Sequence, residues 1–409
     1  MKNLNRKTFI CIKKALFAIF CAAFMISLLI FPTTAVASST RGLNLWLGIV
    51  FPTIFPFLVC SEILNKTGFI KVIGVLFDCI MRPMFGVPGC ASFAFVIGLI
   101  SGYPVGAKIT SELRTEGLIT KIEAEKLLTF TNNSGPLFII GAVATGILKM
   151  PQVGIFLLLS HILASLTVGI LFKFYKNKGS VLCNNKKLNS FTKFKCELLK
   201  YLKVSDHNIG EILIESIKNS ISTILAIGGF IILFSVIISI LVDTGVILLI
   251  SKVILSFLTT TQIQEETIIS FISGLFEITS GINMLSLAHN VDINQKLSAI
   301  SFIIGFAGLS IHAQVLGITA KSDISIKPYL LGKFMHGMFS TVYTIILTKT
   351  FIPYTNNIEA FSKFNSTQYS PNFFEYFMFS IKGLLLIFAM IIFFILVSFI
   401  PSIKRKNFI

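Results

Sequence analysis

The chain has 409 residues, of which 54% are hydrophobic and 13% are charged, and its mean hydropathy is +0.85. This number of polar residues is too small to cover the surface of a soluble protein of this length. The composition therefore predicts a polytopic membrane protein. The net charge of +17 does not indicate nucleic-acid binding, because most Lys and Arg residues lie in short segments beside apolar runs, where they orient helices in a membrane. We expect membrane lipids, and no nucleic acid, as partners of these segments.

The N-terminal segment, residues 1–42, carries basic residues before position 15 and an apolar run over 15–31. This pattern predicts a first transmembrane helix with a cytoplasmic N-terminus. The tripeptide AVA at 35–37 also fits the cleavage site of a signal peptide, which is the alternative. In both interpretations residue 42 lies on the outer side of the membrane.

Residues 43–174 and 217–352 share a pattern that predicts an internal duplication. Matching residues occur in the same order in both segments, at nearly constant spacings of 173–177 residues. The pairs are Thr67 and Thr244, Gly68 and Gly245, Gly98 and Gly274, Gly135 and Gly308, His161 and His336, and Ser165 and Ser340.

Charge predicts that the two repeats have opposite orientations. The linker 175–216 is basic, with ten Lys against four acidic residues between Lys173 and Lys218, and the tail ends in a second basic cluster at 404–406. Basic segments favour the cytoplasm, so we expect the linker and both termini there. Segment 353–409 then holds an outer loop and a C-terminal transmembrane helix over 377–400. Each repeat must therefore cross an odd number of times, which inverts one relative to the other, as in many secondary transporters.

Four apolar runs are interrupted by polar, Gly-containing or Pro-containing stretches. These are SGYP at 101–104, TNNSGP at 131–136, GLFEITSGIN at 274–283 and FAGLSIHAQ at 306–314. An interrupted helix frees backbone groups, which a membrane tolerates only where they face protein or a water-filled cavity. The fold that we expect is therefore all-α, with two inverted repeats of broken or re-entrant helices and one flanking transmembrane helix at each end.

The segment 110–128 alternates charged and apolar residues between the first two breaks. This pattern predicts one surface helix, with Thr120 and Glu123 forming a capping box at its second turn. Asp78 and Arg82 are four residues apart and are expected to pair with each other.

Glu277 is the carboxylate that we expect to bind the solute or a cation, because it lies beside a break at the place that Ser101 occupies in the other repeat. The alternative is that Glu277 reaches headgroup water near the end of a short segment. We expect the breaks to form one substrate-binding site from Glu277, Ser101, Gly102, Tyr103, Pro104, Asn132, Asn133, Ser134, Gly135, Thr279, Ser280 and His312.

Other interpretations stay open for several of these polar residues. Asn132, Asn133 and Ser134 could cap a helix. His161 and His336 could form hydrogen bonds between helices or transfer a proton, and His312 is the better candidate because it adjoins a break. The seven Cys residues form no CxxC pair, and the sequence shows no nucleotide-binding motif, metal-ligand spacing or catalytic order. We expect no enzyme activity, no metal and no cofactor.

Four sequence blocks together carry a family resemblance: RGLNLWLGIVFPTIFPF at 41–57, SGYPVGAK at 101–108, TNNSGPLFIIGAV at 131–143 and GLFEITSG at 274–281. Over about residues 40–350 the chain resembles the YlbJ-type sporulation integral membrane proteins. That family belongs to the group with a gate, or nucleoside-recognition, domain, which nucleoside transporters and FeoB-type iron transporters share. The resemblance implies a cell-membrane protein of endospore formation that contributes to the spore cortex. The chain has no GTPase domain, so iron transport is not implied.

Two functions remain open on the sequence. The first is transport or gating of a small polar solute through a site built from the breaks. The second is a non-transporting assembly factor that holds other sporulation membrane proteins through its basic linker and the segment 110–128. A water-accessible polar cavity at the breaks would favour the first.

Overall fold

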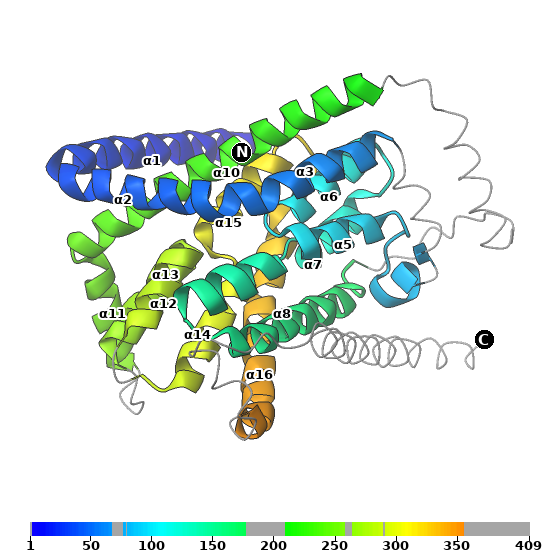
Figure 1. Cartoon of the computed structure of the whole chain (residues 1–409). Helices are drawn as coiled ribbons and strands as arrows, with labels where there is room; N and C mark the ends of the chain where they lie inside the picture. The colour runs from blue at the N-terminus through cyan, green and yellow to red at the C-terminus, as the bar shows by residue number, and fades with distance from the viewer. Residues whose placement is uncertain are drawn as a thin grey trace, which may run out of the picture.

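The computed structural model describes residues 2–67, 77–78, 80–176, 209–257, 264–288 and 291–355, and all regular structure within these residues is helical (Figure 1). The helices are α1 (Lys2–Ile30), α2 (Pro32–Leu45), η1 (Trp46–Val50), α3 (Phe51–Lys66), α5 (Ala91–Ser101), α6 (Val105–Thr115), α7 (Lys121–Thr131), η2 (Leu137–Ile147), α8 (Pro151–Phe172), α10 (Ile209–Asp243), α11 (Val246–Phe257), α12 (Glu265–Phe276), α13 (Ile278–Leu287), α14 (Ile293–Phe306), α15 (Gly308–Thr319) and α16 (Ile326–Thr355). Within the described part of the chain, α8, α10, the α14–α15 pair and α16 are long and apolar enough to cross a membrane. The pair α1 and α2, bent by 104°, could supply a fifth crossing.

All four predicted helix breaks are present. They lie at residues 102–104, at 132–136, at Glu277 and at Ala307, between consecutive helices of the pairs α5–α6, α7–η2, α12–α13 and α14–α15. The two halves therefore repeat the same order, in which two broken helices precede one long helix, α8 or α16. The predicted all-α membrane fold with broken helices is confirmed.

The first break is held by close contact with the second. Gly102 has a φ of 85°, a left-handed conformation that favours glycine. A Cβ atom at Gly102 would lie 2.8 Å from the backbone nitrogen of Gly135, so only two glycines allow the two breaks to approach this closely. The breaks are thus positioned by backbone contact, which fixes the walls of any site between them.

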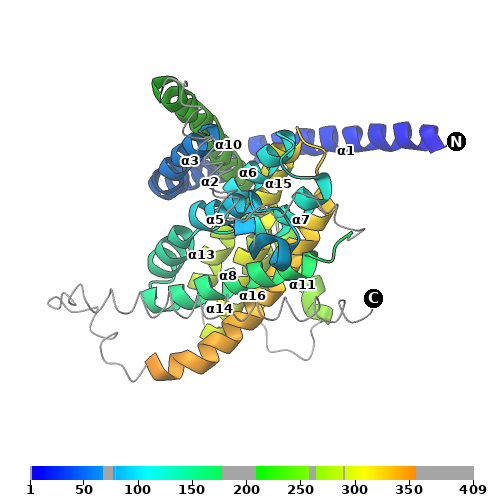
Figure 2. The ribbon, with the colours of Figure 1, turned by 90° about the vertical axis from the view of Figure 1, so that its right-hand side faces the viewer.

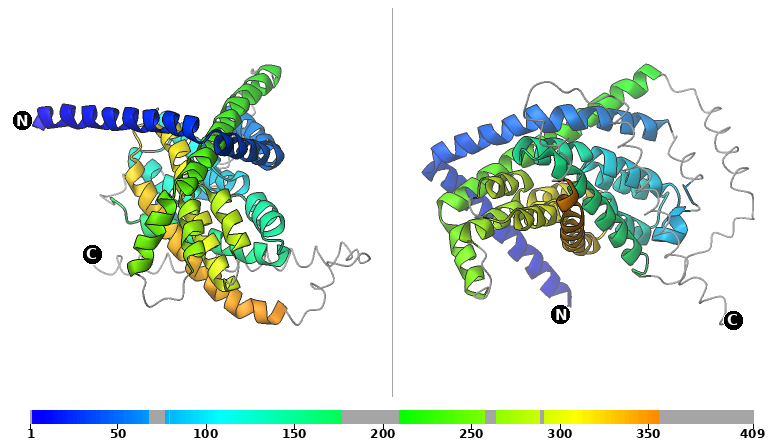
Figure 3. Two further views of the ribbon diagram at one scale, coloured as in Figure 1. Left: turned by 90° about the vertical axis from the view of Figure 1, so that its left-hand side faces the viewer. Right: turned by 60° about the horizontal axis from the view of Figure 1, so that its bottom comes forward.

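The long helices cross in the centre of the molecule, and α1 lies at its edge. In Figures 2 and 3, α1 extends beyond the other helices, and many of its apolar side chains are exposed, among them Leu16, Phe17 and Leu29. The helix α16 packs along α8 and α14, and its outward side chains Phe334 and Met338 are also apolar. These outer apolar surfaces fit the hydrocarbon of a bilayer.

The prediction of a single surface helix over 110–128 is wrong. The chain forms α6 and α7 instead, separated by a turn in which Gly117 has a φ of 72°, and the capping box of Thr120 and Glu123 lies at the first turn of α7. Most of α7 is buried because its charges have internal partners. Glu125 accepts a hydrogen bond from Tyr175 at 3.2 Å, and Lys126 donates one to the Lys173 carbonyl at 2.9 Å.

Several predicted boundaries fall inside helices. The boundaries near residues 42, 216 and 352 lie within α2, α10 and α16, respectively. The middle of the linker (177–208) and the helix expected over 377–400 lie outside the described residues. The Asp78–Arg82 pair is confirmed, with nitrogen and oxygen 2.9 Å apart.

Candidate functional site: a pocket between four helix breaks

An internal pocket of about 80 Å³ lies where the four broken pairs meet. Its wall includes residues at or near all four breaks: Ser101, Gly102, Tyr103, Ser134, Gly135, Glu277, Ile278, Thr279, Ser310 and Ile311. A volume of this size holds only a few water molecules, at about 30 Å³ each. The pocket therefore suits an ion or one polar group of a solute rather than a whole metabolite.

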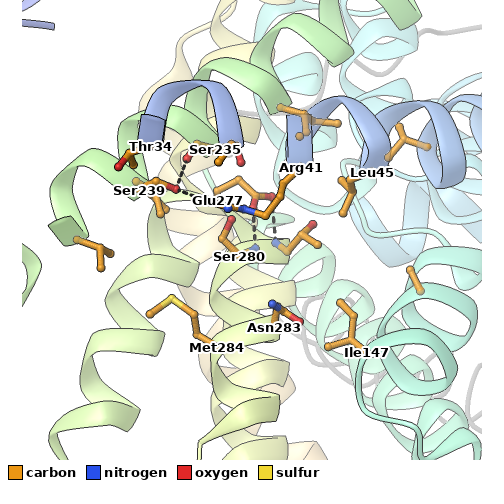
Figure 4. A pocket seen from close by; sticks show the side chains of 18 of the residues that line it. Thr34, Arg41, Leu45, Ile147, Ser235, Ser239, Glu277, Ser280, Asn283 and Met284 are labelled. Atoms are coloured by element: carbon orange, nitrogen blue, oxygen red, sulfur yellow. Dashed lines mark hydrogen bonds between the residues drawn. The ribbon is translucent and has the colours of Figure 1, made fainter. Parts of the chain in front are cut away.

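A larger cleft of about 670 Å³ adjoins the pocket and shares Glu277 and Thr279 with it (Figure 4). The remaining walls come mainly from α2, η2, α10 and α13, and they include Arg41, Asp243 and Asn283. Binding sites for small molecules commonly enclose about 300–1,000 Å³, so the cleft has room for a metabolite. Glu277 lies at the junction, where it can reach a ligand in either space.

Glu277 is the C-cap residue of α12 and the N-cap residue of α13. Its side chain is 7% exposed, and its two carboxylate oxygens accept hydrogen bonds from the backbone N–H groups of Thr279 at 2.9 Å and Ser280 at 2.7 Å. The positive end of the α13 dipole stabilises this negative charge. A carboxylate has about four acceptor sites, so both oxygens can still bind a cation or a donor.

Two hydroxyl groups in the pocket wall lack hydrogen-bond partners among the described residues. Ser101 Oγ and Ser134 Oγ are both buried, and neither contacts a donor or an acceptor. Buried polar groups without partners are rare because each costs free energy. These two hydroxyl groups and Glu277 therefore give the pocket wall polar atoms that can bind a polar group of a ligand.

Three predicted site residues do not line this pocket. Asn132 donates from Nδ2 to the Tyr329 hydroxyl at 3.0 Å, and His312 Nδ1 lies 3.1 Å from the same hydroxyl. Asn133 Nδ2 donates to the Phe130 carbonyl at 2.7 Å. The expectation of one cavity shared by Glu277, Asn132, Asn133 and His312 is therefore wrong. The side chains of Asn132 and His312 contact the hydroxyl of Tyr329 on α16 instead of lining the pocket.

The remaining predicted residues, apart from Pro104, line the pocket or the larger cleft. Ser280 lines the larger cleft, and Pro104 precedes the first residue of α6 without lining either space. Whether each residue binds a solute stays a prediction. The lysine of the SGYPVGAK stretch, Lys108, points away from the pocket and forms an ion pair with Glu62 of α3, with Thr223 of α10 3.2 Å from its amine.

Sequence reasoning missed Lys333, which is completely buried in α16. Its amine donates to the Asn132 carbonyl at 2.9 Å, lies 3.1 Å from His336 Nδ1 and sits 5.1 Å from the ring centre of Tyr103. The repeat-related histidines His161 and His336 also meet here, with ring centres 4.4 Å apart. A lysine inside an apolar run of a membrane protein was the signal that could have identified this centre.

The described residues contain no group of three or more His, Cys, Asp or Glu residues that could hold a metal ion. Glu277 is the carboxylate that both the pocket and the larger cleft share.

Comparisons with known proteins identify the family. Residues 47–169 match the family described as Gate, nucleoside recognition. The sporulation integral membrane protein YlbJ of Bacillus subtilis (strain 168) is 38% identical over 341 residues, which cover 82% of each chain. The solved structure of CNTnw in an inward-facing substrate-bound state shares 14% identity over 80% of this chain and 85% of that chain, with a TM-score of 0.39.

Helices that are long and apolar enough to cross a membrane, together with the match to the gate family, define an integral membrane protein with a gate domain. More specifically, the chain belongs to the family of the sporulation integral membrane protein YlbJ.

Proposed function

We propose that this protein carries a small polar solute across a membrane of the sporulating cell, through the pocket between the four breaks, and that this transport serves formation of the spore cortex. The observation that carries the proposal is the placement of Glu277, a buried carboxylate that faces both the inner pocket and the larger cleft. A charged group at such a place in a membrane protein is costly, and it is usually retained for a ligand or an ion.

The two spaces suggest how binding would be divided. The cleft has the volume for the body of a metabolite, and the pocket accommodates one polar group, which would contact Glu277, Ser101 and Ser134. The matched family is described as nucleoside recognition, so nucleosides are the first solutes to test, followed by cell-wall precursors. A ligand of the folded state raises its apparent stability, so a thermal-shift screen of the purified protein identifies candidates.

Water access separates a transporter from an assembly factor. In a variant without the seven native Cys residues, Ser101→Cys should react with a small hydrophilic thiol reagent, because its side chain lines the pocket. Ala94→Cys is the matched negative control, since Ala94 is completely buried in an apolar cluster away from both spaces. An unreactive Ser101→Cys would support the assembly-factor function instead.

The decisive variant is Glu277→Gln. Glutamine keeps the size of the side chain and can accept at least one of the two backbone hydrogen bonds, so membrane levels should stay normal. Loss of the charge should abolish solute binding in the thermal-shift assay and formation of heat-resistant spores. Normal sporulation with Glu277→Gln would refute a role of this carboxylate in transport.

A further inference from the structure

A cluster of three titratable residues lies where α8 and α16 cross, beside the pocket. Lys333 and His336 come from α16 and His161 comes from α8, and all three side chains are completely buried. None of the three lines the pocket or the cleft. Solute binding as described above therefore gives this cluster no role.

The hydrogen bonds determine which nitrogen of each histidine carries a proton in the neutral form. The backbone N–H of Ser134 donates to His161 Nε2 at 3.0 Å, so the proton of His161 is on Nδ1, which has no partner among the described residues. His336 Nε2 donates to the His161 carbonyl at 3.0 Å. His336 Nδ1 is therefore an acceptor for Lys333.

Lys333 is accommodated in both of its protonation states. A neutral amine has two N–H groups, which the Asn132 carbonyl and His336 Nδ1 accept, and its lone pair remains available for a proton. An ammonium has a third N–H group, and the ring of Tyr103 lies at cation–π distance for it. The site thus holds either form without rebuilding its contacts.

No described carboxylate forms an ion pair with Lys333. The titratable groups that face the amine are His336 on its own helix, His161 on α8, and Tyr103 beside the first break. Tyr329 and His312 follow through Asn132, which bonds the Tyr329 hydroxyl. A buried ammonium without a carboxylate is expensive, so water-filled and closed states of the neighbouring pocket should differ in how well they support the charge.

The cluster is connected directly to two walls of the pocket. Lys333 bonds the carbonyl of Asn132, which ends α7 at the second break, and it lies against Tyr103, which lines the pocket. His161 bonds the backbone of Ser134, another lining residue. Hydrogen bonds from a charged donor are about twice as strong as neutral ones, so protonation of Lys333 strengthens its hold on the second break.

We propose that Lys333 binds and releases one proton during the transport cycle, and that this proton controls the conformation of the pocket. In the binding step, the pocket opens beside Tyr103 so that water reaches Lys333, and the amine takes a proton from a hydronium ion, which leaves an ammonium and a water molecule. The reverse step returns the proton to water. The inference rests on the proposed transport function and names the proton as the coupling ion.

The test compares pocket accessibility at several pH values. The labelling rate of Ser101→Cys is divided by that of Lys321→Cys, an exposed residue between α15 and α16, which corrects for the pH dependence that an exposed thiol shows with the same reagent. A conformational equilibrium coupled to one proton changes by up to about tenfold per pH unit, so the ratio should change by this order within the range of about pH 5 to 9. A constant ratio would overturn the proposal.

Two variants assign the proton to Lys333. Lys333→Met keeps the length of the side chain but cannot bind a proton, so the ratio should lose the part of its pH dependence that Lys333 causes and keep only the titration of the thiol itself. His336→Gln can accept from Lys333 and donate to the His161 carbonyl without titrating, so the pH dependence should persist with a displaced midpoint. An unchanged pH profile in Lys333→Met would also overturn the proposal. If Lys333→Met does not fold, Lys333→Gln replaces it.

A second readout keeps the inference separate from the transport function. Trp46 is the only tryptophan of the chain, it is buried, and it packs on Gly228 of α10 between the lining residues Leu45 and Val50. Its fluorescence should follow the same proton in the parent protein and lose the pH dependence in Lys333→Met. If Ser101→Cys never reacts, transport is refuted, and the fluorescence comparison still decides whether Lys333 controls the conformation.

Discussion

The two repeat-related breaks beside the pocket are built differently. At the first, Gly102 takes a left-handed conformation, and α6 begins after Pro104 without a side-chain cap. At the corresponding break of the second half, Glu277 is extended, with φ −142° and ψ 120°, and its carboxylate caps α13. The break at Gly102 therefore depends on close backbone packing, and the break at Glu277 supplies a charge.

Both charged groups beside the pocket, Glu277 and Lys333, come from the second half. The carboxylate of Glu277 lies at a break of the second half, and the amine of Lys333, on α16 of the same half, contacts the breaks of the first half at Asn132 and Tyr103. Both halves contribute residues to the pocket wall, and neither half alone encloses the pocket.

The largest effect should come from adding one methyl group to repeat-related glycines. A Cβ atom at Gly98 would lie 2.0 Å from the backbone oxygen of Thr131, which cannot move without shifting α7. At Gly274 it would lie 2.4 Å from Cδ1 of Ile303, the end of a flexible side chain. Overpacking typically costs about 1–3 kcal/mol, so we expect Gly98→Ala to reach or exceed this range and Gly274→Ala to stay near its lower end.

Thermal unfolding in detergent measures this difference, with Gly141→Ala as the control because no heavy atom lies near its added methyl group. Equal destabilisation by Gly98→Ala and Gly274→Ala would show that the two breaks are packed alike. That outcome would contradict the contrast between the backbone contact at Gly98 and the side-chain contact at Gly274.

The second prediction concerns the cap at Glu277. Glu277→Ala removes both acceptors of the α13 N-terminus and should lower the free energy of unfolding by about 0.5–2 kcal/mol. Ser101→Ala, at the corresponding place in the first half, removes a hydroxyl that has no partner among the described residues and should change stability little. A stability loss from Ser101→Ala as large as that from Glu277→Ala would show that the first break also depends on its side chain.

A smaller loss of stability is expected from removing the caps of α7 and α14, which occupy corresponding places in the two halves and are built from different residues. Thr120 forms a capping box with Glu123, while Asp292 accepts hydrogen bonds from Asn294 and Gln295. We expect Thr120→Ala and Asp292→Ala each to cost about 1 kcal/mol, measured by the same thermal unfolding. Asp292→Asn should retain most of the stability because its side-chain oxygen still accepts, whereas a full loss would assign the effect to charge.

Local sequence signals predicted the breaks because their causes are local. Gly102, the TNNSGP stretch and an acid at 277 each interrupt an apolar run, and the structure has a break at every one of these places. The convergence of the breaks followed from the cost of free backbone groups in a membrane. This reasoning also placed Glu277 correctly beside the pocket.

Side-chain partners that are distant in sequence could not be predicted. Alternating charges over 110–128 indicated a solvated helix, but Glu125 and Lys126 have partners at the end of α8 and just after it. Asn132, which follows α7, bonds the hydroxyl of Tyr329 on α16, 197 residues away in sequence. The meeting of His161 and His336 required the crossing of α8 and α16, which no periodicity reveals.

The smallest expected effect concerns an ion pair that joins the two halves at the surface. Arg114, at the end of α6, makes two hydrogen bonds to Asp323 in the turn before α16, with distances of 2.8 and 3.0 Å. The hydrogen bond from Arg114 lowers the pKa of the Asp323 carboxyl below its usual value. Because the pKa is lower in the folded state, the pair stabilises the fold above about pH 4, and this contribution is lost as the pH falls through the folded-state pKa.

Asp323→Asn should therefore lower the apparent melting temperature slightly near neutral pH, and the difference from the parent protein should vanish in acid. Asp323 is exposed and Arg114 is partly exposed, so salt should screen most of the effect. Glu116→Gln, an exposed carboxylate in the turn between α6 and α7, is the matched control and should show no such difference. If the Asp323→Asn difference persisted unchanged at low pH, the contact would act through packing or a neutral hydrogen bond, and the electrostatic link between the halves would be disproved.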